Sequence, residues 1–248
     1  MELKNLISTS ETVDVYQNGN MAIKLFKEGC RKTMALYEAL THARVEDTGL
    51  NIPRIHEVSV IGSRWAIHMD HIKGKTLADI MKEDPENMDK YLEQMLDIQL
   101  EIHSKKVPKL SKLKDKLSRQ INELDCIDDA KRYEMLTRLE GMPKHDKLCH
   151  GNFIPENIII NENGTYIVDW VAARQGNASA DVGRTYLLLS LDNPDFAEKY
   201  LNRFCEKTNT SKKYVQEWLP IVAAARLTEN RPEERDLLMK WTDVVLYE

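Results

Sequence analysis

Alternating apolar and polar residues predict a small sheet at the start of the chain. In Met21–Phe26, Ile23 and Leu25 fall on one face of the strand and Lys24 falls on the other. The turn signal Asn18-Gly19 comes just before this segment and makes it the second strand of a hairpin. The other strands expected in this part of the chain are Val13–Gln17, Arg54–Val60 and Trp65–Met69.

A helix is expected at Arg31–Asp47, because Met34, Tyr37 and Leu40 recur at helical spacing. These three apolar residues are predicted to form its packing face, with Glu38 beside them at mid-helix. The first seventy residues therefore predict the order β-β-α-β-β, which is a small sheet with one helix.

Helical spacing dominates after the polar segment Asp70–Gly74, which is expected to link two lobes. Tyr91–Ser104 carries the broad apolar stripe of a helix that packs on a core. Lys109–Glu140 is predicted to form two charged helices with a break near Asp125–Asp128. Further helices are expected at about 181–190, 194–207, 211–227 and 231–247. The pattern predicts an α+β, bilobal protein: a small β-rich N-lobe at residues 1–72 and a larger, mostly helical C-lobe at residues 73–248.

Composition argues against two kinds of partner, nucleic acids and membranes. The net charge of −5 argues against nucleic acid as a partner, because duplex binding needs a basic face. No apolar run approaches the roughly 20 residues of a membrane span, so no membrane association is expected. The four cysteines lack paired spacing and are interpreted as reduced thiols of a cytoplasmic protein. We expect a monomer or a weak homodimer.

One hairpin is predicted inside the helical part of the chain. Its strands, Ile158–Ile160 and Thr165–Val168, flank a turn that ends in a glycine. Asn157 precedes the first strand and Asp169 follows the second, so the hairpin is expected to bring them side by side, roughly 5 Å apart at Cβ. Amide and carboxylate oxygens suit Mg²⁺, which shares its coordination shell with phosphates. Asn157 and Asp169 are therefore the predicted metal ligands.

A tight turn, His150-Gly151-Asn152, lies directly upstream of this hairpin and ends in a polar side chain directed to the same place. A catalyst that activates a hydroxyl would carry a carboxylate at the third position. The amide of Asn152 cannot accept a proton as a carboxylate does.

Two charged residues of the predicted N-lobe suit phosphate binding. Lys24 can meet phosphate oxygens as a point charge, and Glu38 can pair with Lys24 across the lobe and hold it straight. Each residue taken alone is more typical of an exposed surface charge. The local pattern leaves both interpretations open.

The segment from Cys149 to Ile160, followed by Ile167-Val168-Asp169-Trp170, resembles the active-site signature of the aminoglycoside phosphotransferase / choline kinase-like family. That family has the protein-kinase-like fold, which the resemblance therefore implies here. The matching motifs occur in the family's order over most of residues 6–190. They include the nucleotide-binding strand Ala22-Ile23-Lys24-Leu25, the hinge Met69–Gly74, the helix end Leu100–His103 and the segment Gly176–Gly183.

The resemblance implies a nucleotide site. Lys24 would hold the α- and β-phosphates of ATP, oriented by Glu38, and GTP is the alternative nucleotide. Asn157 and Asp169 would hold Mg²⁺ on these phosphates. The hinge would meet the adenine edge through residues Met69, Asp70 and Ile72. The phosphate-covering loop departs from the family because it has no glycine, so the hydroxyls of Ser10 and Thr12 are expected to supply hydrogen bonds there.

The resemblance also implies a catalytic loop. Asp181 would brace this loop rather than react, and His150 would support it. Asn152 occupies the position of the family's Asp, which accepts the proton of the acceptor hydroxyl or orients that hydroxyl. General-base help is worth roughly 10²–10⁴-fold in rate, so Asn152 predicts a slow enzyme or an inactive one.

Two functions follow. The first is an ATP-dependent phosphotransferase that moves the γ-phosphoryl group to a hydroxyl of a small molecule. The alternative is a nucleotide-binding pseudokinase with a sensing or scaffolding role. Only eleven residues lie between Asp169 and Asp181, which leaves little room for a peptide-docking platform and argues against a protein kinase.

The acceptor is expected to be a hydroxylated small molecule. Three carboxylates in the C-terminal helices, at Glu229, Glu233 and Glu234, would favour a cationic acceptor if they line the pocket. A charged outer surface of these helices is the alternative interpretation.

Overall fold

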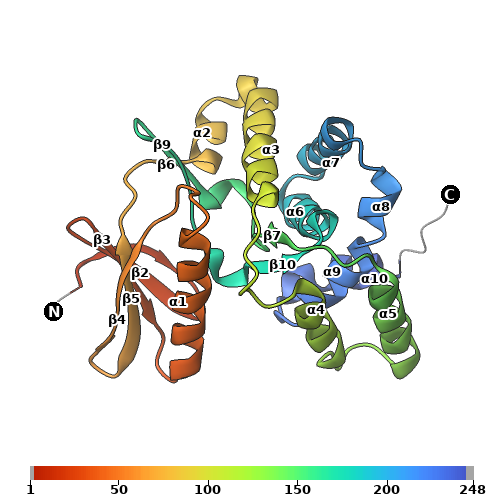
Figure 1. Cartoon of the computed structure of the whole chain (residues 1–248), viewed down its shortest axis with the longest axis horizontal. Coiled ribbons are helices and arrows are strands. Elements are labelled where there is room, and N and C mark those ends of the chain that lie inside the picture. The colour runs from red at the N-terminus through yellow and green to blue at the C-terminus, as the bar shows by residue number, and fades with distance from the viewer. Residues whose placement is uncertain (1–2, 244–248) are drawn as a thin grey trace. The chain divides into compact units, whose positions relative to one another are not determined.

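A computed structural model describes residues 3–243 of the chain (Figure 1). By their internal contacts these residues form two compact units. Of the described residues, unit 1 holds those up to Tyr91 together with Pro155–Ala173, and unit 2 holds Leu92–Ile154 together with those from Arg174 onward. Unit 1 is therefore built from two separate stretches of the sequence.

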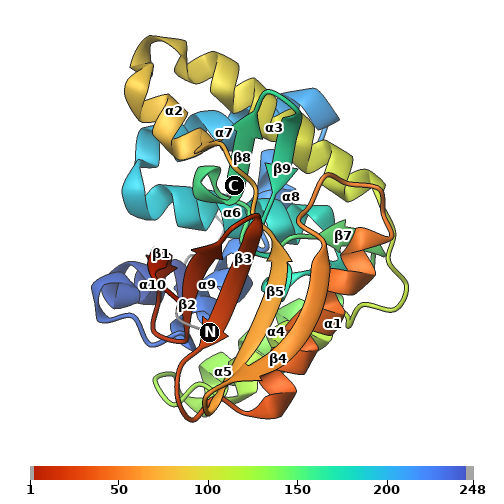
Figure 2. The ribbon, with the colours of Figure 1, turned by 90° about the vertical axis from the view of Figure 1, so that its left-hand side faces the viewer.

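Unit 1 contains an antiparallel sheet of five strands in the order β1-β2-β3-β5-β4. Figure 2 shows the longer strands side by side. The four strands predicted from alternation are confirmed, and a further, fully exposed strand, β1, joins the edge. The strands are β1 (Asn5–Thr9), β2 (Val13–Asn18), β3 (Met21–Phe26), β4 (Ile55–Ile61) and β5 (Arg64–Asp70).

Helix α1 (Lys32–Glu46) packs on this sheet, but through a different face from the predicted one. Ala35 and Ala39 lie against Phe26 and Ile67 in the core of the unit. The three residues predicted to pack, Met34, Tyr37 and Leu40, are each more than 40% exposed. The prediction failed because the helix has apolar side chains on both sides. The small alanines, rather than the large residues, allow close approach to the sheet.

The predicted hairpin is present in unit 1 as β8 (Ile158–Asn161) and β9 (Gly164–Ile167). A short strand, β6 (Lys75–Thr76), pairs with β8 and leads into helix α2 (Leu77–Glu83), neither of which was predicted. Thr76 caps α2 by accepting a hydrogen bond from the Asp79 N–H. Two 3-10 turns flank the hairpin: η2 (Pro155–Asn157) and η3 (Trp170–Ala172). A third, η1 (Pro85–Asn87), follows α2.

Unit 2 is mostly helical, and a core cluster in it is built from α4, α5, α6, α9 and α10. Trp218 is fully buried in this cluster. Two short strands, β7 (Lys147–Cys149) and β10 (Arg174–Gly176), pair antiparallel. The helices are α3 (Met88–Ser104, which begins in unit 1), α4 (Leu113–Asn122), α5 (Asp129–Gly141), α6 (Ala178–Asp192), α7 (Pro194–Thr208), α8 (Lys212–Gln216), α9 (Leu219–Leu227) and α10 (Arg235–Thr242), with the 3-10 turn η4 (Pro232–Glu234).

The predicted break near Asp125–Asp128 is confirmed, since Asp128 caps α5 by accepting from the Lys131 N–H. The single helix predicted at 211–227 is wrong, because α8 ends at Gln216 and α9 begins at Leu219 with Pro220 in its first turn. The helix predicted at 231–247 is shorter in the structure, and residues 244–248 lie outside the described part. No helix in residues 3–243 is long and apolar enough to cross a membrane.

The two units are divided differently from the predicted lobes at 1–72 and 73–248. Residues 73–91 and 155–173 group with unit 1 by their contacts, because β6 pairs with β8 and α1 packs beside η3. Asn157 and Asp169 therefore belong to the same unit as Lys24.

Candidate functional site

Lys24 is the centre of a charged cluster in unit 1. The residue lies in the middle of β3, opposite Val15 on β2 and Ile67 on β5. Its ammonium group forms an ion pair with Glu38 of α1 and lies 3.5 Å from Oδ1 of Asp169. Lys24 and Glu38 are both mostly buried, with side chains 14% and 12% exposed. The exposed surface charges suggested by the local pattern are therefore wrong for both residues.

Burial and charge act in opposite directions on Lys24. Burial lowers the pKa of its ammonium group, since desolvation disfavours the charged form. The carboxylates of Glu38 and Asp169 more than offset this effect and raise the pKa of Lys24 above its usual value of 10.5. Lys24 is therefore a permanent cation at neutral pH, held in place by two carboxylates.

The hairpin brings Asn157 close to Asp169 across its open end. Ile158 pairs with Ile167, and the Val168 N–H donates to the Asn157 carbonyl at 3.0 Å. Asp169 is the next residue, with a left-handed backbone at φ 64°, which a non-glycine residue seldom adopts. Its side chain is 29% exposed, so it remains accessible to a ligand. Within residues 3–243 there is no cluster of three or more His, Cys, Asp or Glu side chains arranged to hold a metal.

The loop between β1 and β2 holds the predicted phosphate contacts Ser10 and Thr12. The Ser10 hydroxyl accepts from the Val13 N–H at 3.2 Å and can donate to the Val13 carbonyl at 3.3 Å. The Thr12 carbonyl accepts from the Lys27 N–H at 2.8 Å. Both residues are exposed, and in this structure the Ser10 hydroxyl stabilises its own turn.

The predicted hinge follows β5. Met69 is paired within the sheet, and the Asp70 N–H donates to the Arg54 carbonyl at 3.0 Å. The Asp70 carboxylate accepts from the Arg54 N–H and lies 2.7 Å from His56 Nε2. Burial opposes ionisation of this carboxyl, but the hydrogen bonds from His56 and Arg54 leave the pKa of Asp70 below its usual value. Ile72 lies beyond the end of β5.

In unit 2, the buried carboxylate of Asp181 holds the loop that follows β7. Its Oδ1 accepts from the Gly151 N–H at 2.7 Å, and its Oδ2 accepts from the His150 N–H at 3.1 Å. His103, at the end of α3, approaches Oδ2 through Nε2 at 2.9 Å. Burial raises the pKa of Asp181, but His103 and these N–H groups outweigh it and hold the pKa below its usual value. Asp181 is thus a structural anion that fixes the loop.

Asn152 is the first side chain beyond these fixed residues. Gly151 adopts φ 78°, the left-handed region that glycine enters at low cost. The Asn152 N–H then donates to Nδ1 of His150 at 3.2 Å, so the imidazole of His150 defines the turn. His150 is fully buried, and its ring nitrogen accepts this hydrogen bond from the backbone of the loop.

The C-terminal carboxylates are engaged by arginines. Glu229 forms ion pairs with Arg184 of α6 and Arg226 of α9. Glu234 is buried and binds Arg226 through both oxygens, each at 2.6 Å. Glu233 is exposed. Because two of the three carboxylates are neutralised, the reason for expecting a cationic acceptor is weakened.

Sequence reasoning missed Arg184, which joins the C-terminal ion pairs to the loop. Its Nε donates to the Gly151 carbonyl at 3.3 Å, while its Nη2 lies 2.6 Å from Glu229. No motif marked this residue, since an arginine on a helix is usually exposed.

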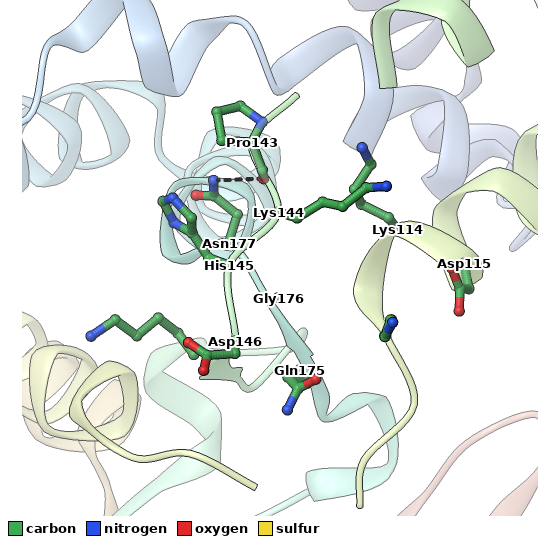
Figure 3. Close-up of a pocket in the computed structure, with 11 residues that line it drawn as sticks. Lys114, Asp115, Pro143, Lys144, His145, Asp146, Gln175, Gly176 and Asn177 are labelled. Atoms are coloured by element: carbon green, nitrogen blue, oxygen red, sulfur yellow. Dashed lines mark hydrogen bonds between the residues drawn. The ribbon is translucent and has the colours of Figure 1, made fainter. Parts of the chain in front are cut away.

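A cavity of about 680 Å³ lies beside β10 in unit 2. Figure 3 shows Lys114, Lys144 and His145 around it, with the Asn177 amide donating to the Pro143 carbonyl. None of the predicted site residues lines this cavity. It is therefore separate from the groups described above.

The sequence profile of the phosphotransferase enzyme family matches residues 21–218. The chain belongs to this family. No curated protein matches the sequence.

Solved structures of phosphotransferases share the fold. Aminoglycoside phosphotransferase APH(4)-Ia is 15% identical, with a TM-score of 0.69 over 97% of this chain and 90% of that one. Amicoumacin kinase hAmiN is 10% identical, with a TM-score of 0.67 over 96% and 86% of the two chains. Choline kinase LicA from Streptococcus pneumoniae is 14% identical, with a TM-score of 0.63 over 95% and 86%. The protein-kinase-like fold expected from the sequence motifs is thereby confirmed.

Proposed function

We propose that this protein is an ATP-dependent phosphotransferase that moves the γ-phosphoryl group to a hydroxyl of a small molecule. The observation that carries the proposal is the cluster of Lys24, Glu38 and Asp169. A buried lysine held straight by one carboxylate and adjacent to a second, accessible one suits the phosphates of a nucleotide and their metal ion. Family membership supports the same reaction class.

The nucleotide would be held by unit 1. Lys24 would bind the α- and β-phosphates, with Glu38 keeping its ammonium group in place. Asn157 and Asp169 offer an amide and a carboxylate oxygen, a donor set that suits Mg²⁺, and this ion would neutralise charge on the phosphates. APH(4)-Ia has been solved with ADP and hygromycin B, and hAmiN with AMP-PNP and Ca²⁺, which supports ATP as the nucleotide here and leaves GTP as the second choice to test.

The acceptor would react at the loop that Asp181 braces. Its hydroxyl oxygen forms a bond to the γ-phosphorus, the bond from that phosphorus to the β,γ-bridging oxygen breaks, and ADP leaves. Asn152 would orient the hydroxyl by accepting a hydrogen bond through Oδ1. Because an amide does not take the proton, the hydroxyl proton passes to solvent and the rate is low. A cytoplasmic location is part of this proposal, and the four cysteines support it because they are free thiols.

A second candidate is a pseudokinase that binds nucleotide without transferring phosphate. Asn152 is the observation that favours it. Both candidates require the nucleotide cluster of unit 1, and they differ only in turnover.

Turnover and binding are tested separately. ADP release is measured with a panel of hydroxylated acceptors for this chain and for Asn152→Asp, which restores a carboxylate. We expect slow turnover by the natural chain and a rise of roughly 10²–10⁴-fold in the variant. Asn163→Asp, at the exposed tip of the hairpin, makes the same charge change and is expected to leave the rate unchanged.

Thermal unfolding with and without Mg·ATP tests the shared binding step, because a ligand that binds the folded state raises the midpoint. A midpoint shift without turnover by either chain would establish the pseudokinase. If nucleotide at saturating concentration shifts neither the natural chain nor Asn152→Asp, both candidates are wrong.

A further inference from the structure

A second cavity in unit 2, with a volume of about 710 Å³, lies beside the start of α6. Its walls come from the end of α3, from β7, from the first residues of α6, and from the end of α7 and the segment that follows it. It shares His145, Lys147 and Asn177 with the cavity of Figure 3. None of the site residues predicted from the sequence lines it, so the proposed reaction leaves this cavity without a role.

The walls of this cavity carry a lysine but no carboxylate. Among the described residues that line it, none is Asp or Glu, although the whole chain has a net charge of −5. Lys147 is half-buried, and within residues 3–243 its ammonium group has no hydrogen bond or ion pair. Its charge acts on the neighbouring Asp146, but that carboxylate is bound to Lys106 at 2.8 Å. Lys147 is therefore a cation that the described chain does not pair.

Ser179, the second residue of α6, brings a hydroxyl to the same cavity. The residue is only 5% exposed, and its N–H donates to the Asn177 side chain at 2.9 Å. In the described part of the chain its hydroxyl has no hydrogen-bond partner. The fully enclosed side-chain atoms without a partner there belong to His71, His103 and Trp218, so the Ser179 oxygen is reachable from the cavity. Because buried hydroxyls are normally paired, its partner is expected to come from solution.

Tyr214 and the end of α6 add to this set of donors. The Tyr214 oxygen accepts from the Asn177 amide at 2.6 Å, and no group in residues 3–243 accepts the hydrogen of its own hydroxyl. Helix α6 has 15 residues and begins at Ala178, which also lines the cavity. The start of a helix carries partial positive charge. A ligand that is negatively charged and accepts several hydrogen bonds matches all of these groups.

We propose that this cavity binds the phosphate group of a small molecule, with Lys147, Ser179 and Tyr214 as hydrogen-bond donors at the start of α6. A phosphate monoester presents three acceptor oxygens and suits both a lysine and a helix N-terminus. Leu100 and Phe204 line the same cavity and offer apolar contact to the organic part of such a molecule. The site is independent of the proposed function, whose nucleotide is assigned to unit 1.

The inference is tested by calorimetric titration of methyl phosphate into the protein saturated with Mg·AMP-PNP, so that the phosphate positions of the nucleotide site are filled. We expect a Kd of about 1 mM or lower. Acetate offers fewer oxygens and less charge, and glycerol offers no charge. Both are expected to bind at least about tenfold more weakly than methyl phosphate.

Substitutions assign the binding to this cavity. Lys147→Gln and Ser179→Ala are each expected to weaken methyl phosphate binding by about fivefold or more. Lys109→Gln, at an exposed lysine outside the cavity, and Ser190→Ala, near the other end of α6, make the same chemical changes and are expected to leave the affinity unchanged. Circular dichroism checks each fold. Ser179→Ala removes no internal side-chain hydrogen bond, so it remains informative if Lys147→Gln is not folded.

Hydrogen exchange gives the location by a second route. Methyl phosphate is expected to slow exchange at the start of α6 and in residues 208–214, and to leave β3 of the nucleotide cluster unchanged. Protection of β3 without protection of α6 would place the anion at the nucleotide site and overturn the inference.

The inference is also overturned if methyl phosphate does not bind at about 20 mM, if acetate binds as tightly, or if either folded variant, Lys147→Gln or Ser179→Ala, binds it as the natural chain does. Failure of the proposed function gives a different result, which is absent AMP-PNP binding or absent turnover. The dependence of phosphate binding on Lys147 and Ser179 can still be measured in that case, because it does not require bound nucleotide.

Discussion

Asp181→Asn is expected to destabilise the protein, because it removes a carboxylate that holds the loop after β7. The natural carboxylate accepts from the Gly151 N–H at Oδ1, and from the His150 N–H and His103 at Oδ2. An asparagine keeps one oxygen and replaces the other with an NH₂ group. If its oxygen takes the Oδ2 position, two donors keep their partner and the Gly151 N–H faces another donor.

This arrangement leaves two buried polar groups without partners, the Gly151 N–H and the new NH₂. Each costs about 1–3 kcal/mol, so we expect a loss of about 2–6 kcal/mol in the free energy of unfolding. Removing one member of a buried charged network typically costs about 3–5 kcal/mol, which agrees with this range.

Urea unfolding, followed by the fluorescence of the chain's four tryptophans and by circular dichroism, measures the loss. Asp125→Asn, at an exposed loop position between α4 and α5, is the control and is expected to change stability by less than about 0.5 kcal/mol. If Asp181→Asn is no less stable than the control, Asp181 does not hold the loop and the reasoning is refuted.

Three further predictions concern other parts of the chain. Gly74→Ala is expected to lower the free energy of unfolding by about 1–3 kcal/mol, because its Cβ would lie 2.5 Å from a backbone carbonyl oxygen of β8. Gly141→Ala is the control: its Cβ would have free space, so it is expected to be neutral or slightly stabilising. Paired urea titrations that show equal effects of the two substitutions would contradict this. Glu38→Gln is expected to weaken Mg·AMP-PNP binding by about tenfold, because Lys24 loses the partner that orients it; calorimetry that shows unchanged affinity would argue against the role of this pair. Burial lowers the pKa of Lys116 on α4 to about 7, and Lys116→Met is expected to be more stable than the natural chain. The gain in its free energy of unfolding is expected to be larger at pH 6 than at pH 10, by about 1 kcal/mol or more. Below a folded-state pKa of about 7 the buried charge carries its full cost, and that cost disappears as pH rises toward the unfolded value of 10.5; a difference that is independent of pH would disprove the shift.

The order of elements and the charged cluster were predictable because they depend on local patterns. Alternation in β3 put Lys24 on the face that α1 covers, and the Asn18-Gly19 turn fixed the register of its hairpin. The turn before Gly164 likewise placed Asn157 near Asp169. In each case a short segment with a single low-energy conformation determines the position of a functional side chain.

The packing face of α1 was not predictable in the same way. Large apolar residues at Met34, Tyr37 and Leu40 gave the correct helix but the wrong face, because Ala35 and Ala39 contribute little apolar area to a sequence pattern. Which side of such a helix is buried depends on how closely the sheet can approach it. That distance is set by the side chains of the sheet, which the helix sequence does not contain.

The cations of unit 2 were also beyond sequence reasoning. Arg184 lies on α6 and Lys116 on α4, and no spacing in the sequence indicates that their charges act on one another in the folded chain. The acidic residues near the C-terminus were visible in the sequence, but the arginines that neutralise them were not recognisable as their partners.

The two-part construction of unit 1 sets an order for folding during synthesis. The five-stranded sheet and α1 leave the ribosome first, but residues 155–173 follow only after all of 92–154 have emerged. Until then Lys24 and Glu38 lack Asp169, and β6 lacks its pairing strand. The nascent sheet must therefore persist as an incomplete intermediate while much of unit 2 is made, and such intermediates are prone to aggregation. A pause in translation between residues 92 and 154 would prolong exposure of this intermediate, whereas one after residue 173 would not.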